Sequence, residues 1–436
     1  MKIAAVPKPG EWPIDPQTDV KISKHRIWVD GCFDFAHHGH AGALLQARRL
    51  GNELWVGIHS DEEIMENKGP TVMTLKERVA AVDACRWSTK SVPYAPYVTS
   101  LPWISHYGCQ YVVHGDDITS DSSGEDCYRY VKAASRFLVV KRTPGISTTD
   151  LVGRMLLCTK NHFIRSPLKA LTGEEGSESP VERKRLGDEM SQRIRDYATD
   201  ETGLQPGPQV LSWAGSRAAM EDHASEERGT FRTLANGKTP HHGQRIIYVD
   251  GGFDLFSSGH IEFLRQVAIA EEAIGHENGW YEDSSKDYGP AYIVVGVHDD
   301  EVINHWKVSS EKYVDSVIFS APFTPSKAYL MNIPYGIPDA VYHGPTSFMP
   351  LTYDPYTAAK ALGVYHEIGN HDFQNVNAGE IVQRILKSRE IYEERQRAKG
   401  EKAATEEAVQ RREAMEQEAS RLEKDRAANS VLVFMP

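Results

Sequence analysis

The sequence is poor in cysteine, and this limits the chemistry that it can support. Its five cysteines all lie in the first half of the chain, at Cys32, Cys85, Cys109, Cys127 and Cys158. Their number is odd and no Cys-x-x-Cys pair occurs, so neither a disulfide framework nor a structural zinc site is expected. We expect buried free thiols in a reducing compartment.

The sequence also lacks long apolar runs and an excess of basic residues. No segment approaches the roughly 18 apolar residues of a spanning helix, and residues 1–24 hold four prolines without the apolar stretch of a signal peptide. We therefore expect a cytoplasmic protein. The net charge of -12, from 49 basic and 61 acidic residues, argues against a nucleic-acid partner, because phosphate neutralisation needs a concentrated basic surface. A small anionic substrate remains compatible with a local basic pocket.

One phrase occurs twice in the chain. Residues 27–40 read IWVDGCFDFAHHGH and residues 247–260 read IYVDGGFDLFSSGH, at an offset of 220. The first copy contains a His-x-Gly-His motif at His37, Gly39 and His40, whereas Ser257 replaces the first histidine in the second copy. Further pairs recur at offsets of 239, 229 and 230, so the sequence predicts two related domains.

Apolar runs and amphipathic segments alternate along both copies. Strands are expected at 26–29, 54–59, 110–114 and 137–140, and helices at 40–50, 74–87 and 126–134. This alternation predicts an α/β fold with two tandem Rossmann-like, doubly wound parallel sheets. We divide the chain into an N-terminal extension, a catalytic domain, a polar linker without strands, a degenerate copy and a charged C-terminal helix with its tail, at 1–24, 25–160, 161–244, 245–388 and 389–436.

The first copy carries the residue types of a phosphate site. A strand that ends in a glycine turn presents backbone N–H groups, and two imidazoles at a helix start can face one phosphoryl group. A second segment, RTPGISTT at 142–149, places a guanidinium ahead of a Ser/Thr-capped helix. We expect nucleotide binding at Gly31, Cys32, Phe33, Asp34, Gly39, Arg142, Ile146, Ser147, Thr148 and Thr149.

These segments, with Lys-Gly-Pro-Thr-Val-Met at 68–73 and Glu77-Arg78, resemble the HxGH cytidylyltransferases. Within them the chain is most similar to the branch that acts on phosphoethanolamine, and tandem duplication is a trait of that branch. The resemblance implies transfer of CMP from CTP to phosphoethanolamine, giving CDP-ethanolamine and diphosphate, with Mg²⁺ accompanying CTP and no metal site built from protein residues. It assigns catalytic roles to His37, His40, Lys68 and Arg142.

The resemblance also suggests where the second substrate binds. Asp117 and Tyr97 are the candidates for the primary ammonium group, by ion pairing and by a ring-face contact. Asp34 is expected to orient the motif or a metal-bound water. Peripheral association with the endoplasmic reticulum and a homodimer are further possibilities that the sequence leaves open.

The second copy lacks residues of this pattern that phosphate chemistry needs. Besides Ser257, the counterpart of Arg142 is Asp372, and the Ile-Ser-Thr-Thr run is absent. Lys307 falls opposite Lys68 by offset, but a deletion beside it makes that alignment unreliable. We predict no CTP turnover in this copy, whose expected role is to pack against the first domain.

Three alternatives remain at this level. The substrate ester could be phosphocholine or glycerol 3-phosphate. A class I aminoacyl-tRNA synthetase shares the HxGH motif, but it would need a KMSKS-like loop and a basic tRNA-binding surface, and neither is visible. Finally, the chain could be a non-enzymatic, nucleotide-sensing scaffold.

Overall fold

The computed structural model describes residues 2–397 apart from short gaps, and the statements below refer to the described residues. The gaps are 9–10, 16, 18–19, 118, 144–145, 158–165, 216–228, 254, 281–288, 290, 299–307, 346–352 and 395–396. Among these residues no helix is both long enough and apolar enough to cross a membrane. The helix expected over 389–436 lies almost entirely outside the described part.

The first domain is built on a parallel five-stranded sheet in the order β3-β2-β1-β4-β5. Its strands are β1 (Ser23–Gly31), β2 (Glu53–Ile58), β3 (Lys90–Pro93), β4 (Cys109–Gly115) and β5 (Phe137–Val140). The chain winds outward from β1 in both directions, which is the predicted doubly wound arrangement. The crevice of such a sheet lies at the carboxyl ends of its two central strands, here β1 and β4, where ligands bind in this class of fold.

The second domain repeats this order within a seven-stranded sheet, β12-β11-β8-β9-β10-β6-β7. The strands are β6 (Gln209–Gly215), β7 (Gly229–Ala235), β8 (Arg245–Gly251), β9 (Ala291–His298), β10 (Ser316–Ala321), β11 (Ala340–His343) and β12 (Tyr365–Glu367). The parallel series from β10 to β12 matches the first sheet strand for strand. The predicted duplication is therefore confirmed at the level of topology.

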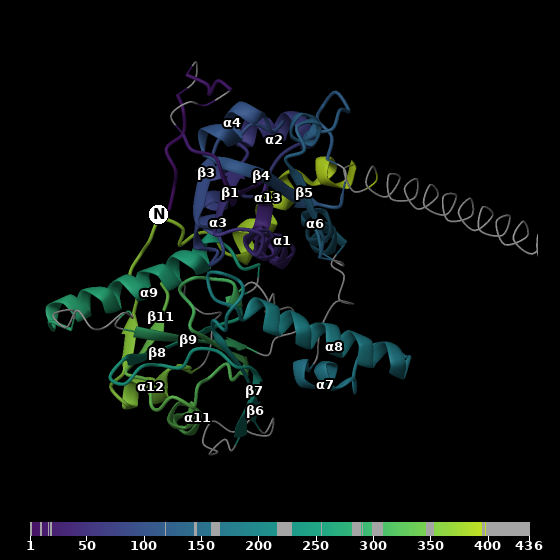
Figure 1. Cartoon of the computed structure of the whole chain (residues 1–436). Helices are drawn as coiled ribbons and strands as arrows, with labels where there is room; N and C mark the ends of the chain where they lie inside the picture. The colour runs from purple at the N-terminus through teal and green to yellow at the C-terminus, as the bar shows by residue number, and fades with distance from the viewer. Residues whose placement is uncertain are drawn as a thin grey trace, which may run out of the picture.

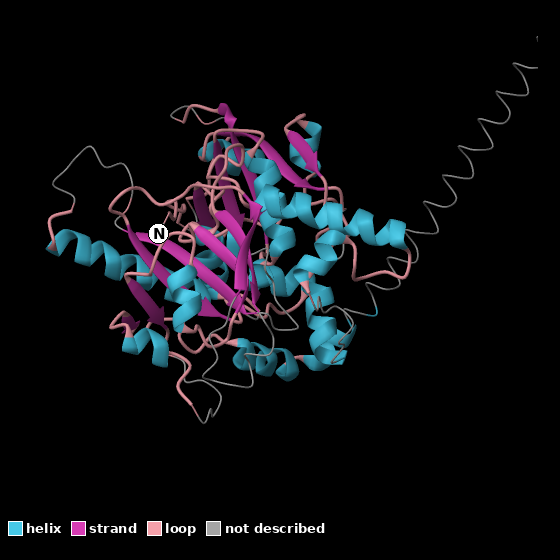
Figure 2. Ribbon diagram, turned by 90° about the horizontal axis from the view of Figure 1, so that it is seen from below, coloured by secondary structure: helices cyan, strands magenta, loops and turns pink. Residues whose placement is uncertain are grey.

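Helices cover both sheets, and the strands form layers between them (Figures 1 and 2). The first domain contains the 3₁₀ turn η1 (Asp34–Ala36) and the helices α1 (His38–Arg48), α2 (Asp61–Lys68), α3 (Leu75–Ala84), α4 (Leu101–His106), α5 (Arg129–Ala133) and α6 (Thr148–Leu157). The second contains α9 (Ser258–Glu277), α11 (Lys327–Asn332), α12 (Thr357–Ala361) and α13 (Ala378–Lys387). The predicted capping box at the start of α3 is present, with Thr74 and Glu77 bonded reciprocally.

The segment 161–244 is not the strandless linker that its polar composition suggested. It contains α7 (Pro167–Thr172) and α8 (Pro180–Tyr197), and its strands β6 and β7 extend the second sheet, with β6 paired in parallel to β10. The end of α8 contacts the first domain, where the Tyr197 hydroxyl donates to the carbonyl of His38 at 2.7 Å. The expectation failed at β7 because it is the edge strand of this sheet, and its exposed positions tolerate polar residues. β6 lies between β10 and β7, and its buried run, Val210–Trp213, is short.

The two domains pack directly against each other. The Arg86 guanidinium of the first domain donates to the carbonyls of Glu311 and Val314, each at 2.6 Å. Lys312 lies 3.3 Å from the Asp83 carboxylate. The largest cluster of buried apolar side chains includes members from both sheets, so the domains share one continuous core.

Candidate active site

The loop after β1 has an unusual backbone. Phe33, Phe35 and Ala36 adopt left-handed conformations, with φ of 55°, 61° and 38°. Such conformations are costly for residues other than glycine and persist only where the surroundings enforce them. Here the buried Asp34 carboxylate accepts hydrogen bonds of 2.9 Å from the backbone N–H groups of both Val72 and Met73. Asp34 therefore ties this loop to the segment before α3.

The two motif histidines stack face to face at the start of α1. Their ring centroids are 3.9 Å apart and their planes differ by 23°. His37 is the N-cap of the helix, and its Nδ1 accepts from the Gly39 N–H at 3.1 Å. Since Nδ1 is an acceptor, the ring proton of a neutral His37 lies on Nε2, where it can be donated to a ligand oxygen.

Gly39 is required by close packing around this pair. A Cβ atom at this position would lie 2.8 Å from Cγ2 of Ile146 and 3.0 Å from the His37 ring. The helix start, the imidazole and the 142–149 segment therefore meet at one glycine. This contact brings together two motifs that are more than a hundred residues apart in the sequence.

A cavity of about 320 Å³ opens at this point, above the carboxyl ends of β1 and β4. It is large enough for a small-molecule ligand. Its wall includes the side chains for which the sequence predicts catalysis or phosphate binding, namely His37, His40, Lys68, Arg142, Ser147, Thr148 and Thr149. Gly31, Cys32, Phe33, Asp34, Gly39 and Ile146 line it as well.

The start of α6 faces the same cavity. The Ser147 side chain caps the helix through the N–H of Asp150 at 3.1 Å, and its hydroxyl lies 2.6 Å from the Asp150 carboxylate. Thr148 donates to the carbonyl of Asp34 at 3.2 Å. The predicted Ser/Thr helix start is therefore present and is bonded to the loop after β1. Pro144 and Gly145 of the motif lie outside the described residues.

Arg142 and Asp117 lie opposite each other on the cavity wall. The guanidinium and the carboxylate are 3.5 Å apart, and both side chains are about half exposed. Asp117 is also 3.9 Å from Nδ1 of His114. An exposed pair of this kind is weak, so a charged ligand can displace it at small cost.

Tyr97 does not reach the cavity wall. Its buried ring lies next to His59, with centroids 5.2 Å apart, and beneath the Lys68 ammonium, 5.6 Å from the ring centre. Burial lowers the pKa of His59. In this conformation Tyr97 supports Lys68, and of the two predicted ammonium-binding residues only Asp117 lines the cavity.

Two buried charged residues that hold the site were not assigned from the sequence. Arg78 donates to the carbonyls of Cys32 and Met73, at 2.7 and 3.2 Å, and pairs with Asp61 at 2.6 Å. Asp30 accepts hydrogen bonds from Trp28, Thr99 and Tyr128. The signal for Asp30 was its repetition in Val-Asp-Gly, since Tyr356 bonds Asp250 at 2.6 Å in the same way.

The second domain retains a cavity of about 740 Å³ at the corresponding place, but its chemistry differs. Four histidines, His260, His298, His343 and His371, line it, and none of its described lining residues is Lys or Arg. Asp372, the counterpart of Arg142, is not on this wall; it pairs with Lys76 of the first domain at 3.0 Å. The negative charge that replaces Arg142 therefore lies at the domain interface and not in the cavity. Lys307 lies outside the described residues.

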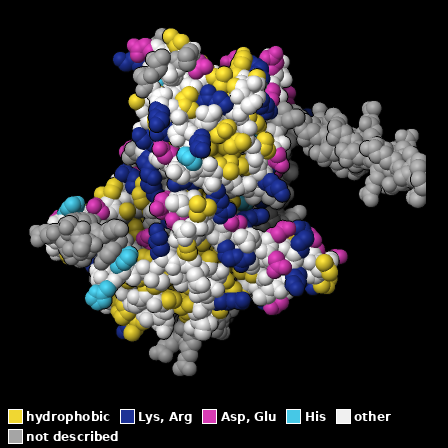
Figure 3. All heavy atoms as spheres, in the orientation of Figure 1, with side chains coloured by type: hydrophobic (Ala, Val, Ile, Leu, Met, Phe, Trp, Pro, Cys, Tyr) yellow, Lys and Arg dark blue, Asp and Glu magenta, His cyan; other side chains and the backbone are white. Residues whose placement is uncertain are grey.

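Surface charge gives no sign of a nucleic-acid interface on the face shown in Figure 3. Lys and Arg side chains are interspersed there with acidic and apolar ones over both domains. A continuous basic surface, which backbone phosphates would require, is not seen on that face.

Comparison with known proteins agrees with this geometry. Residues 28–154 match the family described as cytidylyltransferase-like. The chain is 37% identical over 393 residues to the ethanolamine-phosphate cytidylyltransferase of Dictyostelium discoideum, covering 86% of this chain and 94% of that protein. It is 35% identical over 394 residues to the enzyme of the same name from Mus musculus, covering 86% and 89%.

A choline-directed relative matches over a shorter range. The choline-phosphate cytidylyltransferase 2 of Arabidopsis thaliana is 36% identical over 242 residues, covering 54% of this chain and 71% of that protein. The ethanolamine-directed relatives therefore share nearly the whole two-domain chain, whereas this relative shares little more than half.

Proposed function

The chain belongs to the family of ethanolamine-phosphate cytidylyltransferases, which make CDP-ethanolamine from CTP and phosphoethanolamine, and we propose that the cavity of the first domain alone carries out this reaction. The observation that carries the proposal is the stacked His37–His40 pair at the start of α1, in one cavity with Lys68 and Arg142. The cavity of the second domain has no such cations among its described lining residues.

The reaction is an in-line displacement at the α-phosphorus of CTP. An oxygen of the phosphoethanolamine phosphate forms a bond to this phosphorus as the bond to the β-phosphate oxygen breaks, and diphosphate leaves. No covalent enzyme intermediate forms, so catalysis is positioning and stabilisation of charge. His37 and His40 contact the α-phosphoryl group and the departing diphosphate, while Lys68, Arg142 and the N–H groups at the start of α6 neutralise the phosphates.

Mg²⁺ is proposed to enter with CTP. When bound, it would supply positive charge that neutralises the triphosphate. Asp30 and Asp34 are already used as hydrogen-bond acceptors, and the described residues contain no group of three or more metal-binding side chains. This donor set fits an ion whose ligands come mainly from the nucleotide.

Asp117 is proposed to bind the ammonium group of phosphoethanolamine. Its carboxylate lies at the cavity wall beside Arg142, so the pair can separate to take the two ends of the zwitterionic substrate. Tyr97 then acts from behind, through the cation–π contact that orients Lys68. We also propose a cytoplasmic location, peripheral attachment to the endoplasmic reticulum and a homodimer.

Two matched substitutions test the division of labour between the domains. His40→Ala should lower kcat/KM by about 10²–10³-fold, the usual loss for one transition-state contact. His260→Ala should stay within a few fold of the unsubstituted chain. Equal losses in the two variants would contradict a single active domain.

A comparison of three esters tests the substrate. CTP-dependent release of diphosphate should be fastest with phosphoethanolamine and much slower with phosphocholine and glycerol 3-phosphate. Preference for either of the latter would contradict the assignment. A CTP titration should give one site per chain, and two sites would contradict an inactive second domain.

A further inference from the structure

The last described helix of the second domain lies against the active-site side of the first. Figure 1 shows α13 beside α6, far from the centre of its own sheet. Apolar side chains from both domains form one buried cluster here, in which Phe373, Ile381 and Ile385 meet Phe35, Val72 and Met73. The surface of α13 is therefore fixed relative to the loop that carries Asp34.

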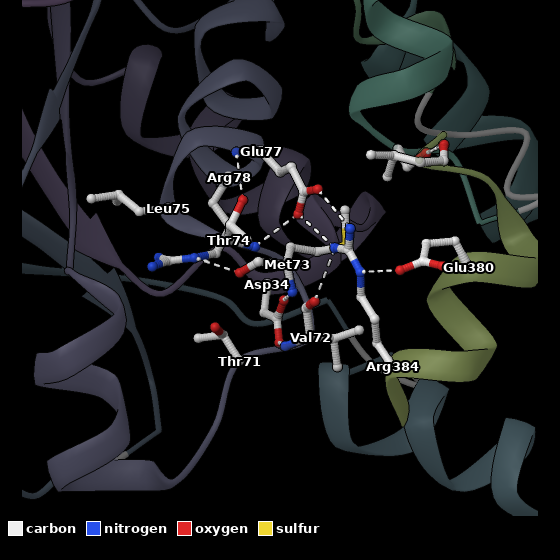
Figure 4. Close-up of polar contacts among 12 residues, drawn as sticks. Asp34, Thr71, Val72, Met73, Thr74, Leu75, Glu77, Arg78, Glu380 and Arg384 are labelled. Atoms are coloured by element: carbon white, nitrogen blue, oxygen red, sulfur yellow. Dashed lines mark hydrogen bonds and ion pairs between the residues drawn. The ribbon is translucent and has the colours of Figure 1, made fainter. Parts of the chain in front are cut away.

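Arg384 extends from α13 into the polar centre of this contact (Figure 4). Its guanidinium binds both oxygens of the Glu77 carboxylate, at 2.8 and 3.0 Å, and donates to the carbonyl of Val72 at 3.3 Å. Glu380, one turn earlier on α13, accepts from its Nε at 3.2 Å. The two-pronged geometry fixes the orientation of the carboxylate as well as its charge.

Glu77 is almost fully buried, with 6% of its side chain exposed. The same carboxylate accepts the N–H of Thr74 in the capping box, at 2.8 Å. Hydrogen bonding to Glu77 raises the pKa of the Arg384 guanidinium above its ordinary value. Without Arg384 a buried carboxylate would lose its described cationic partner, which is strongly unfavourable.

The segment that Arg384 contacts is the one that holds the active-site loop. Val72 bonds Arg384 through its carbonyl and Asp34 through its N–H group. Met73 supplies the second N–H to Asp34, and Arg78 reaches back to the carbonyl of Cys32. A continuous series of hydrogen bonds thus leads from the second domain to the loop that precedes His37.

We propose that Arg384 is a positioning residue for the active site of the first domain, acting through Val72 and Glu77 on the loop at Asp34. The second domain thereby contributes to catalysis without a site of its own. This inference rests on the proposed function, because the loop matters only if the first-domain cavity is the active one. Positioning of phosphate-binding groups affects the transition state strongly, and small displacements cost about 10²-fold.

The test must separate a positioning role from a structural one. Arg384→Met removes the guanidinium but leaves Glu77 unpaired, so it could lose activity through misfolding. Combining it with Glu77→Gln removes the unpaired charge and keeps an acceptor for the capping box. We expect this double variant to keep its fold, as checked by its melting temperature, while the Val72 carbonyl loses its hydrogen bond from Arg384.

We expect the folded double variant to show a kcat/KM for CTP that is about 10-fold to 100-fold lower, with the KM for phosphoethanolamine unchanged. Arg384→Lys should fall between it and the unsubstituted chain, since lysine keeps the charge without the fork. Asp372→Asn is the matched control, because it removes an exposed ion pair at the same domain interface, and should remain within about 2-fold.

Activity of the folded double variant equal to that of the unsubstituted chain would overturn the inference, as would an equal loss in Asp372→Asn. Failure of the proposed function looks different. In that case the unsubstituted chain itself would not turn over CTP with phosphoethanolamine, or His40→Ala would not impair it.

Discussion

The hydroxyl of Ser257 donates a hydrogen bond of 3.2 Å to the backbone carbonyl of Val376, on the segment that leads into α13. His37 holds the position of Ser257 in the first domain, and Ile146 corresponds to Val376 by the offset of 230. A Cβ atom on Gly259 would lie 2.3 Å from the same carbonyl oxygen. In the second domain, the backbone at Val376 therefore packs against the start of α9. The corresponding helix start in the first domain, that of α1, lines the cavity.

This contact predicts that restoring the lost histidine does not restore chemistry. A chain carrying Ser257→His together with His40→Ala should show no more turnover than His40→Ala alone. The new imidazole would meet a carbonyl oxygen in place of an open phosphate site, and no Lys or Arg is among the described residues of that cavity. Steady-state release of diphosphate from CTP measures the outcome.

The control is Ser257→His in the otherwise unsubstituted chain, which should keep its activity. Recovery of turnover by the Ser257→His, His40→Ala chain above the His40→Ala background would show that one histidine was the only missing part.

Much of the fold could be predicted from the sequence because its signals are local. The strand and helix periods of the first domain, the capping box at Thr74 and the repeated Val-Asp-Gly phrase each depend on neighbouring residues. β7 was missed because an edge strand does not need the apolar alternation that marks a buried one, and β6 was missed because its buried run is short.

The candidate site was predicted in its motifs but not in its supports. The sequence predicted that His37 and His40 face one phosphoryl group from a helix start, but not that their rings stack. Arg78 and Arg384 act through long-range contacts that no local pattern encodes. The ammonium-binding role of Tyr97 stays a prediction. Its type suits a cation, but packing against His59 places it behind Lys68 instead of on the cavity wall.

Close packing at Gly39 makes a second prediction. Gly39→Ala should lower kcat by about 10-fold to 100-fold, because the added methyl group must displace either Ile146 or the His37 ring. The free energy of unfolding should fall by about 0–2 kcal/mol, because overpacking costs about 1–3 kcal/mol and alanine favours the helix by about 1 kcal/mol. Kinetics and urea unfolding of the same preparation separate the two effects.

Gly369→Ala is the control for this substitution. A Cβ atom there would meet no atom within 4 Å, so activity and stability should both be unchanged. Normal kinetics in Gly39→Ala would show that the histidine pair tolerates displacement and would weaken its assigned role.

The motif histidine that the second copy keeps, His260, predicts that stability depends on pH. Burial lowers the pKa of His260 to about 4, and its Nδ1 accepts the N–H of Ser257 at 3.2 Å. An unfolded chain would protonate this ring near pH 6.5. The folded state thus binds fewer protons between these values, and the stability present above about pH 6.5 is lost as the pH falls toward 4.

Between pH 7 and pH 5 we expect this residue to account for a loss of about 1–2 kcal/mol, reduced by its partial exposure to solvent. Urea unfolding at the two pH values should show a smaller loss in His260→Gln than in the unsubstituted chain, and an identical loss in both would contradict a lowered pKa of His260 in the folded state.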